Sequence, residues 1–352
     1  MKSDIVIVGG GIIGLYSAYL LALKGINLTI IDRGEFGHES TWAAGGILSP
    51  LLPWDYDEDI LYLTRGASHT YRSLSQILLE QSKYDIEYWR CGLSVITSDV
   101  QKIKKWCDLN KYLYNTSTDN ESHIHLPDVV QLRSPTLIKA LVKQLDTLGV
   151  KLLANTNVTC CDIKNNQVVG VNTTSGKINT PILIWAAGAW TPELFTDDTK
   201  ISTPNISPIK GQVIALQSQR VKLDTIFFKD SHYLIPRRDG LILAGSTLED
   251  DGYDRSISNN ARNLLWQKSL EIMPELKDSI ISHQWAGLRP GTYKGAPPTI
   301  GPHPNIQGLY FNCGHFRYGI TMAPKSAEIL HNWVTNHGRD LTKHEKSYSK
   351  FD

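Results

Sequence analysis

Residues 4–33 read DIVIVGGGIIGLYSAYLLALKGINLTIIDR, and this stretch decides the fold. Residues 5–8 are all β-branched, which predicts a parallel strand buried on both faces. A helix is predicted over residues 12–24, and residues 28–31 form a second predicted strand. The succession of strand, glycine turn, helix and strand is typical of a doubly wound α/β unit.

Three glycines between the first strand and the helix have G-x-G-x-x-G spacing: Gly9, Gly11 and Gly14. Gly9 allows a tight turn, Gly11 lets a pyrophosphate approach the backbone, and Gly14 lets helix and strand pack closely. The helix N-terminus offers N–H groups to phosphates, and Asp32 can accept hydrogen bonds from ribose hydroxyls. Asp32 also disfavours a 2′-phosphate, although Arg33 beside it weakens that argument. The alternative is a glycine turn that binds no nucleotide.

The composition is that of an ordinary globular protein with a formal net charge of +1. The 352 residues include 36 Lys and Arg against 35 Asp and Glu, so nucleic acid is not an expected partner. The five cysteines have no C-x-x-C spacing, which predicts neither a disulfide framework nor a metal site. They are expected to be thiols in a reducing cytoplasm. Residues 5–23 carry no charge and could pass for a signal peptide or membrane span, but they fit a buried strand, glycine turn and helix better.

Later segments favour FAD over NAD, which the glycine spacing alone does not distinguish. Residues 39–48 are rich in small and hydroxylated side chains that can lie against a large planar ligand, although an ordinary loop fits equally well. Residues 182–190 read as a buried strand followed by a small-residue turn. Residues 309–321 read as a strand and glycine turn, with a helix predicted over 323–333. The N-terminus of that helix could stabilise negative charge on a reduced flavin.

Five segments carry a family resemblance: GGGIIG, ESTWAAGGILSP, WAAGAWT, AGLRPGTYKGAPPTIG and NCGHFRYGITMAP. Together they resemble the D-amino-acid oxidase family of FAD enzymes, and within it the bacterial glycine oxidases of thiamine biosynthesis. The similarity covers essentially the whole chain in the expected order. It implies an α/β fold with a Rossmann-like FAD-binding domain of the glutathione-reductase type and an inserted antiparallel α+β substrate domain.

The resemblance also implies that both domains are discontinuous. The FAD-binding domain is expected from residues 1–80, 130–210 and 287–352, and the substrate-binding domain from residues 81–129 and 211–286. The sequence agrees where it is informative, because segments on either side of the turn Arg237-Arg238-Asp239-Gly240 read as strands.

An amino-acid oxidase needs a carboxylate anchor, and a planar bidentate donor is best suited to this role. By resemblance, Arg289 in GLRPG binds the substrate carboxylate, Arg317 in GHFRYG lies beside flavin and substrate, and Tyr233 adds a hydroxyl to the carboxylate. The alternatives are surface ion pairs for the arginines and an ordinary strand residue for the tyrosine. His315 is interpreted as flavin-facing structure, because hydride transfer from a neutral amine needs no base.

FAD is expected to be non-covalent, because Pro290 stands where sarcosine-oxidase-type relatives carry the flavin-linked cysteine. Tyr318 replaces a residue that is usually small and polar in close relatives, so the pocket mouth is expected to differ. The expected FAD-binding residues lie in the motifs quoted above, apart from Val158: Gly9, Gly11, Ile12, Ile13, Gly14, Asp32, Arg33, Ser40, Thr41, Gly45, Gly46, Ile47, Val158, Gly188, Gly314, His315, Phe316, Arg317, Tyr318, Gly319, Ile320 and Thr321.

The predicted function is oxidative deamination of glycine, another small D-amino acid or an N-methyl amine, with molecular oxygen reoxidising the flavin to give hydrogen peroxide. The predicted protein is cytoplasmic, binds no membrane and resembles enzymes that are often tetramers. One alternative is a D-amino-acid or sarcosine-type dehydrogenase that uses another electron acceptor. A second is a non-catalytic flavin-fold binding protein. A disulfide reductase needs a cysteine pair near the first flavin loop, and no cysteine precedes Cys91.

Overall fold

The dinucleotide-binding unit predicted from residues 4–33 is present. The structure, a computed structural model, describes residues 1–48, 52–116, 122–194 and 201–350. Strand β1 (Ile5–Val8), helix α1 (Ile12–Ala22) and strand β2 (Leu28–Ile31) follow one another as expected. Helix α1 ends two residues before the predicted limit, and Gly25 follows with a positive φ of 74°.

A six-stranded sheet is built around β1, which pairs in parallel with β2 on one side and β12 on the other. The sheet is parallel except for the edge strand β18, which runs antiparallel to β19. All four residues of β1 are buried, as expected for a central parallel strand. The strand order is β18 (Thr299–Pro302), β19 (Leu309–Cys313), β12 (Ile182–Trp185), β1, β2 and β8 (Lys151–Leu153).

Alternate residues of β1 enter two different cores, because successive side chains point to opposite faces of a sheet. Ile5 and Ile7 join helices on one face, and Val6 and Val8 join a three-stranded antiparallel sheet on the other. The central sheet is therefore one layer of three. The helical layer is α1, α4 (Ala67–Ser82), α6 (Ser134–Thr147) and α8 (Gly319–Asn336), and the opposite layer is β11 (Gly176–Asn179), β10 (Gln167–Thr173) and β9 (Val158–Lys164).

The other large sheet has eight strands. It is antiparallel except between β14 and β4, which run parallel. Helix α7 (Asn259–Ile272) packs on one face through the apolar side chains of Leu234 and Leu265. The strand order is β17 (Ile280–Thr292), β13 (Ile206–Gln217), β16 (Leu241–Gly245), β15 (His232–Pro236), β14 (Ile226–Lys229), β4 (Leu93–Ile96), β6 (His123–Leu126) and β5 (Asn115–Thr116).

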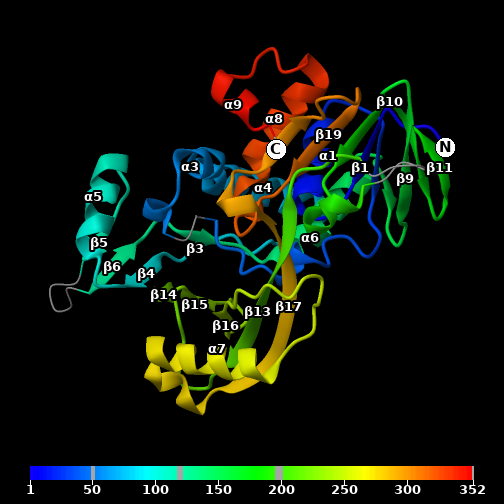
Figure 1. The fold of residues 1–352 in the computed structure, drawn as a ribbon. Helices are drawn as coiled ribbons and strands as arrows, with labels where there is room; N and C mark the ends of the chain where they lie inside the picture. The colour runs from blue at the N-terminus through cyan, green and yellow to red at the C-terminus, as the bar shows by residue number, and fades with distance from the viewer. Residues whose placement is uncertain (49–51, 117–121, 195–200, 351–352) are drawn as a thin grey trace.

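The long strands β13 and β17 connect the two parts of the molecule. Figure 1 shows them running side by side from α7 up to the dinucleotide-binding fold. Both strands cross the domain limits expected at residues 210/211 and 286/287. The remaining elements are shorter: α2 (Ser40–Ala43), η1 (Pro53–Asp55), α3 (Glu58–Thr64), β3 (Trp89–Arg90), α5 (Val100–Asn110), β7 (Val130–Gln131), η2 (Gly188–Glu193), η3 (Pro274–Asp278), η4 (Tyr293–Gly295) and α9 (Lys343–Ser347).

The predicted fold class is confirmed, but both predicted bounds of helix α8 were wrong. Helix α8 begins at Gly319, four residues before the expected start at residue 323, and continues through Pro324 to Asn336, three residues beyond the expected end at residue 333. Pro324 is the sixth residue of the helix and cannot donate to the carbonyl oxygen of Ile320, which instead accepts from the hydroxyl of Tyr71 at 2.8 Å. Within the described ranges, no helix is long and apolar enough to cross a membrane.

Candidate active site

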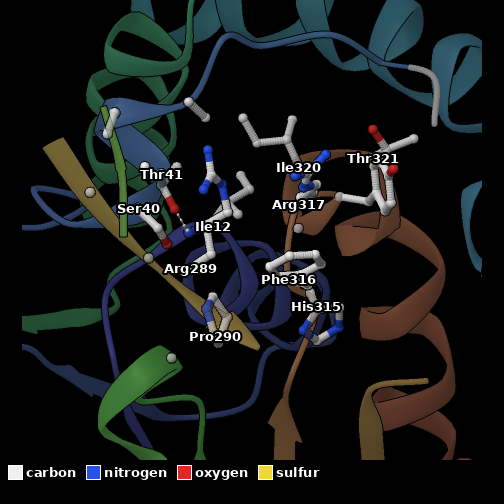
Figure 2. Close-up of a pocket in the computed structure, with 18 of the residues that line it drawn as sticks. Ile12, Ser40, Thr41, Arg289, Pro290, His315, Phe316, Arg317, Ile320 and Thr321 are labelled. Atoms are coloured by element: carbon white, nitrogen blue, oxygen red, sulfur yellow. Dashed lines mark hydrogen bonds between the residues drawn. The ribbon is translucent and has the colours of Figure 1, made fainter. Parts of the chain in front are cut away.

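Two adjoining cavities run between the glycine turn and the eight-stranded sheet. They share Gly11, Ser40, Thr41, Ala186 and Gly188 in their walls, so they form one continuous cleft. One end is lined by Asp32 and Trp190, and the other by Arg289, Arg317 and Tyr233. Figure 2 shows the second end, where Arg289 extends from β17 and Arg317 lies before helix α8.

The glycine turn has the backbone that its sequence predicts. Gly9 has a φ of 109°, and a Cβ built on it would lie 2.2 Å from the carbonyl oxygen of Ala186. A Cβ on Gly14 would lie 1.9 Å from the carbonyl oxygen of Gly9, so Gly14 lets helix α1 pack on β1. The N–H of Ile12 donates to Oγ1 of Thr41 at 3.1 Å. No acidic side chain lies in the first turn of α1, so its positive end can serve an anionic ligand.

Asp32 is engaged by the chain itself at the end of β2. Its Oδ2 accepts from the N–H of Gly10 at 2.6 Å, and Oδ1 accepts from the N–H of Gly34 at 2.9 Å. Burial raises the pKa of the Asp32 carboxyl, and these two donors partly oppose the shift. Each carboxylate oxygen can accept more than one hydrogen bond, and Asp32 lines the cleft. Its carboxylate therefore braces the glycine turn and can still accept from a ribose hydroxyl.

An aromatic and charged group closes the same end of the cleft. The guanidinium carbon of Arg33 lies 3.7 Å from the ring centroid of Trp190, within the range of a cation–π contact. Arg33 also pairs with Glu39 at 3.3 Å, and Glu39 pairs with Arg255 at 2.8 Å. Trp190 belongs to the small-residue turn predicted after β12, but only its structural position shows that it meets Arg33.

Arg289 is a half-buried cation at the other end of the cleft. Its Nη2 donates to Oγ of Ser246 at 2.8 Å, and its Nη1 donates to the carbonyl oxygens of Thr247 at 3.2 Å and Lys210 at 3.4 Å. These partners are all neutral oxygens, and Arg289 forms no ion pair within the part of the chain that the structure describes. Burial lowers the pKa of Arg289 to about 10. A buried cation without an acidic partner is suited to bind an anion.

Tyr233 and Arg317 face the same end of the cleft. Tyr233 is buried on β15, and a Cβ built on Gly245 would lie 2.6 Å from its hydroxyl oxygen. Arg317 is half-buried, and its Nε is buried with no hydrogen-bond partner among the described residues. The Arg317 charge contributes to lowering the pKa of Arg289, which places the two guanidinium groups near each other. The three residues expected to hold the substrate therefore come together in space.

His315 is held inside the protein, although it lines the cleft. Its Nε2 lies 2.9 Å from Oγ of Ser326 in a hydrogen bond, and burial lowers the pKa of the imidazole to about 3. The ring is therefore neutral near pH 7, in agreement with a structural role. Pro290 lines the cleft at the position where flavin-linked relatives carry cysteine. Burial raises the pKa of the nearby Cys313 thiol to about 12, so that thiol is unreactive.

Nearly all the expected FAD-binding residues line the cleft, and Gly14 alone among them does not, because it packs helix against strand. The end near Asp32 and Trp190 includes Gly9, Asp32, Arg33 and Val158. The walls common to both ends include Gly11, Ser40, Thr41 and Gly188. The end near Arg289 includes Ile12, Ile13, Gly45, Gly46, Ile47, Gly314, His315, Phe316, Arg317, Tyr318, Gly319, Ile320 and Thr321.

Two residues that support the site were not anticipated from the sequence. Ser246 holds the Arg289 guanidinium, and no motif marks it. Arg237 is buried and donates to the carbonyl oxygen of Gly45 at 2.9 Å, so it fixes the segment that forms one wall. Its other partners are Oε1 of Gln131 at 2.7 Å and the carbonyl oxygen of Leu132 at 3.1 Å. Its position in the Tyr-Leu-Ile-Pro-Arg strand was a usable signal.

Comparison with known proteins agrees with this geometry. A model of the family described as FAD dependent oxidoreductase (DAO) matches residues 4–333. The chain belongs to this family. It is 35% identical over 345 residues to a glycine oxidase from Pseudomonas aeruginosa, covering 94% of each chain. It is 28% identical over 371 residues to the bifunctional protein ThiO/ThiG of Trichormus variabilis, covering 100% of this chain and 55% of that protein. The solved structure of a glycine oxidase from Bacillus cereus matches with a TM-score of 0.86 and 26% identity over 96% of each chain.

The residues present fit the FAD that the family binds. The glycine turn and the N-terminus of α1 offer backbone N–H groups without a competing acid, as a pyrophosphate requires. Asp32 lies at one end of the cleft for a ribose, and the wider end leads to Arg289 and Tyr233. The protein is an FAD-dependent oxidoreductase, and the end of the cleft near Asp32 is called the nucleotide end.

Proposed function

We propose that the protein oxidises the carbon–nitrogen bond of glycine or another small D-amino acid or N-methyl amine, producing the imine and then the 2-oxo acid. Molecular oxygen is the proposed electron acceptor, and hydrogen peroxide is the proposed second product. The observation that carries this proposal is Arg289, a half-buried guanidinium that lines the cleft and, among the described residues, binds only neutral oxygens. The glycine oxidase of Pseudomonas aeruginosa supports the choice of substrate class.

The proposed mechanism depends mainly on positioning. FAD, when bound, accepts the hydride of the substrate α-carbon. Arg289 binds the substrate carboxylate in a planar two-point contact, and the Tyr233 hydroxyl donates to the same carboxylate. Arg317 adds a second positive charge beside them. Fixing the carboxylate at these points orients the α-hydrogen, which lowers the entropic part of the barrier. No side chain is required as a base, in keeping with the neutral, hydrogen-bonded His315.

Further parts of the proposal rest on the family resemblance. The six-stranded sheet and its layers are the proposed FAD-binding domain, and the eight-stranded sheet is the proposed substrate-binding domain. FAD is proposed to be non-covalent, since Pro290 offers no thiol. Supply of the thiazole of thiamine is supported by the likeness to a ThiO/ThiG protein. A cytoplasmic location and a homotetramer stay predictions.

A single assay tests the central proposal. The purified protein is mixed in air with glycine, sarcosine, and a panel of D- and L-amino acids, and hydrogen peroxide is measured. Peroxide formation with glycine or a small D-amino acid is expected. Bleaching of the flavin by an amino acid without peroxide in air would instead identify a dehydrogenase with another acceptor. If the protein binds FAD and none of these compounds bleaches the flavin, it would be a non-catalytic flavin-binding protein.

A further inference from the structure

We propose that Tyr318 and Tyr56 form a wall that limits substrates to amino acids with no side chain or a very small one on the α-carbon. We call these two residues the tyrosine wall. The inference deepens the proposed function and rests on it, because it narrows the substrate class of the same site. It predicts that glycine is preferred over D-amino acids with branched or aromatic side chains.

Tyr318 is a fixed part of the cleft. It precedes helix α8 and is only 5% exposed, although it lines the cavity that contains Arg289. Its N–H donates to the carbonyl oxygen of His315 at 3.0 Å, and its carbonyl oxygen accepts from the N–H of Met322 at 2.8 Å. Both bonds hold the backbone of the residue at the helix start, and the burial of its side chain restricts the ring.

Tyr56 supports the Tyr318 ring from a distant segment of the chain. The Tyr318 hydroxyl donates to the hydroxyl of Tyr56, which lies between η1 and α3. Their ring centroids are 5.0 Å apart with an interplanar angle of 86°, a favourable edge-to-face geometry. Tyr56 also packs partly against the core that contains α8. The two rings therefore act as one wall with contacts at both ends.

The tyrosine wall lies close to the carboxylate anchor. Negative charge on Tyr318 would raise the pKa of Arg289, and the Arg317 charge acts to lower the pKa of Tyr318. Burial is the main cause of the raised pKa of Tyr318, so its hydroxyl is neutral near pH 7. Tyr318 and Arg289 line the same cavity, so a substrate held by Arg289 lies in the cavity that the Tyr318 ring bounds.

The strand side of the anchor is occupied by protein backbone. A Cβ on Gly245 would lie 2.6 Å from the Tyr233 hydroxyl, and a Cβ on Gly211 would lie 2.1 Å from Nη2 of Arg289. Backbone therefore already touches both anchoring groups on the strand side. A substituent on the α-carbon would have to extend toward the tyrosine wall. Extra bulk in a packed pocket forces side chains or backbone to move, which is unfavourable.

The test compares alanine variants of both members of the wall. Tyr318→Ala removes the inner ring, and Tyr56→Ala removes its support without changing helix α8. Tyr62→Ala is the matched control, because Tyr62 is also half-buried near α3 and its hydroxyl donates to Oε1 of Glu345 at 2.7 Å, away from the cleft. Each variant is assayed with glycine, D-alanine, D-valine and D-phenylalanine, with rates expressed per bound flavin.

We expect the ratio of kcat/KM for D-valine over glycine to rise about tenfold or more in Tyr318→Ala, and to a smaller extent in Tyr56→Ala, since one or two methylene groups change discrimination by about 10–200-fold. Tyr62→Ala should leave the ratio unchanged. Tyr318→Phe should retain the wild-type ratio within about threefold, because the ring itself excludes bulk. An unchanged ratio in both alanine variants, or a parallel loss for all four substrates, would overturn the tyrosine wall.

A binding measurement separates failure of the wall from failure of the proposed function. Acetate and benzoate carry a carboxylate but no amine, and their binding is followed by the change in the flavin absorbance. Tyr318→Ala should strengthen benzoate binding relative to acetate about tenfold or more. If wild-type protein oxidises no amino acid, the proposed function fails, yet this ratio still tests the wall. If amino acids are oxidised but the benzoate-to-acetate ratio does not change, the wall is wrong and the function stands.

Discussion

Two neighbouring regions of strands β13 and β17 bury a cation in opposite ways. Lys210 is 3% exposed and lies near three carboxylates, Asp251 at 2.6 Å, Asp254 at 3.3 Å and Glu249 at 3.4 Å. Hydrogen bonds and charge from these acids raise the pKa of Lys210 despite its burial. Arg289 donates to the carbonyl oxygen of Lys210, yet it binds only neutral oxygens, and burial lowers its pKa to about 10.

The difference indicates which of the two cations has a structural role. A buried charge is costly unless it is paired, so the acids around Lys210 form a complete structural cluster. The same three acids belong to the loop that carries Thr247 and Ser246, whose oxygens hold Arg289. Arg289 is thus held next to Lys210, whose charge is balanced by the three acids. No carboxylate among the described residues pairs with Arg289 itself. In the proposed function, a substrate carboxylate supplies the missing partner.

The largest effect is expected from Arg289→Ala. Loss of a buried charged partner costs about 3–5 kcal/mol, so kcat/KM should fall by about 100-fold or more while the flavin spectrum is retained. Arg289→Lys should recover only part of the activity, because an ammonium cannot form the planar two-point contact.

The control for Arg289 is the type of ligand. Carboxylates without an amine should lose affinity in parallel with kcat/KM, and amines without a carboxylate should be almost unaffected. If Arg289→Ala weakens the binding of both classes of ligand equally, or unfolds the protein, then Arg289 has a structural role like that of Lys210.

Asp32→Ala tests whether the nucleotide end also combines structure with binding. Loss of a charge-assisted hydrogen bond should weaken FAD binding by about 1.5–3 kcal/mol, measured as the FAD dissociation constant. Because Asp32 also accepts from Gly10 and Gly34, Asp32→Asn should preserve part of the turn and part of the affinity. Turnover at saturating FAD should change little. Retained affinity with collapsed turnover would show that Asp32 has another role.

Lys210→Met should reduce stability more than substrate binding. The substitution keeps an apolar stem of similar length but leaves the acids of the loop without their cation, at a cost of roughly 1–3 kcal/mol, toward the lower end because those acids are partly exposed. Thermal unfolding measures this loss. Affinity for carboxylates should fall less than tenfold, a smaller effect than for Arg289→Ala. A loss of carboxylate affinity equal to that of Arg289→Ala would mean that the two regions act as one.

The sequence predicted the dinucleotide unit nearly to the residue, because its signals are local. Strands β1 and β2 have the predicted bounds, since four consecutive β-branched or apolar residues and a glycine turn leave few alternatives. The start of α8 was placed four residues late, because Gly319 and the β-branched Ile320 and Thr321 are weak helix formers and tertiary packing decides the helix start.

The site was only partly predictable, because its contacts are between distant residues. Arg289, Tyr233 and Arg317 were identified through motifs, and the cleft brings them together. Ser246 and the acids around Lys210 lie on a loop without a motif, and nothing in their spacing shows that they surround β13 and β17. The contact between Tyr56 and Tyr318 joins residues 262 positions apart, which no local pattern can reveal.

Tyr233→Phe should show the pattern of Arg289→Ala at a smaller scale. A single neutral hydrogen bond is worth about 0.5–1.5 kcal/mol, so kcat/KM should fall by roughly two- to tenfold. The phenyl ring preserves the packing against Gly245, so stability should be nearly unchanged. Acetate affinity should fall by a similar factor. Unchanged acetate affinity would remove Tyr233 from the carboxylate anchor and leave it as a strand residue.

The smallest effect is expected from His315→Gln. This variant tests whether the His315 imidazole carries a charge, as the side chains of Lys210 and Arg289 do. Burial lowers the pKa of His315 to about 3, so the imidazole is neutral in the folded protein above that value, whereas it protonates in the unfolded chain below about pH 6.5. The unfolded state therefore binds more protons in this window, and stability falls as the pH falls from about 6.5 toward 3. Glutamine can replace the hydrogen bond to Ser326 without titrating. The thermal unfolding temperature of the variant should consequently decline less steeply on acidification than that of the wild type.

The pH profile of kcat/KM between about pH 5 and 8 should keep its shape in His315→Gln, because the wild-type imidazole carries no charge there. A profile that loses a limb in the variant would identify His315 as a proton acceptor and contradict a purely positional mechanism.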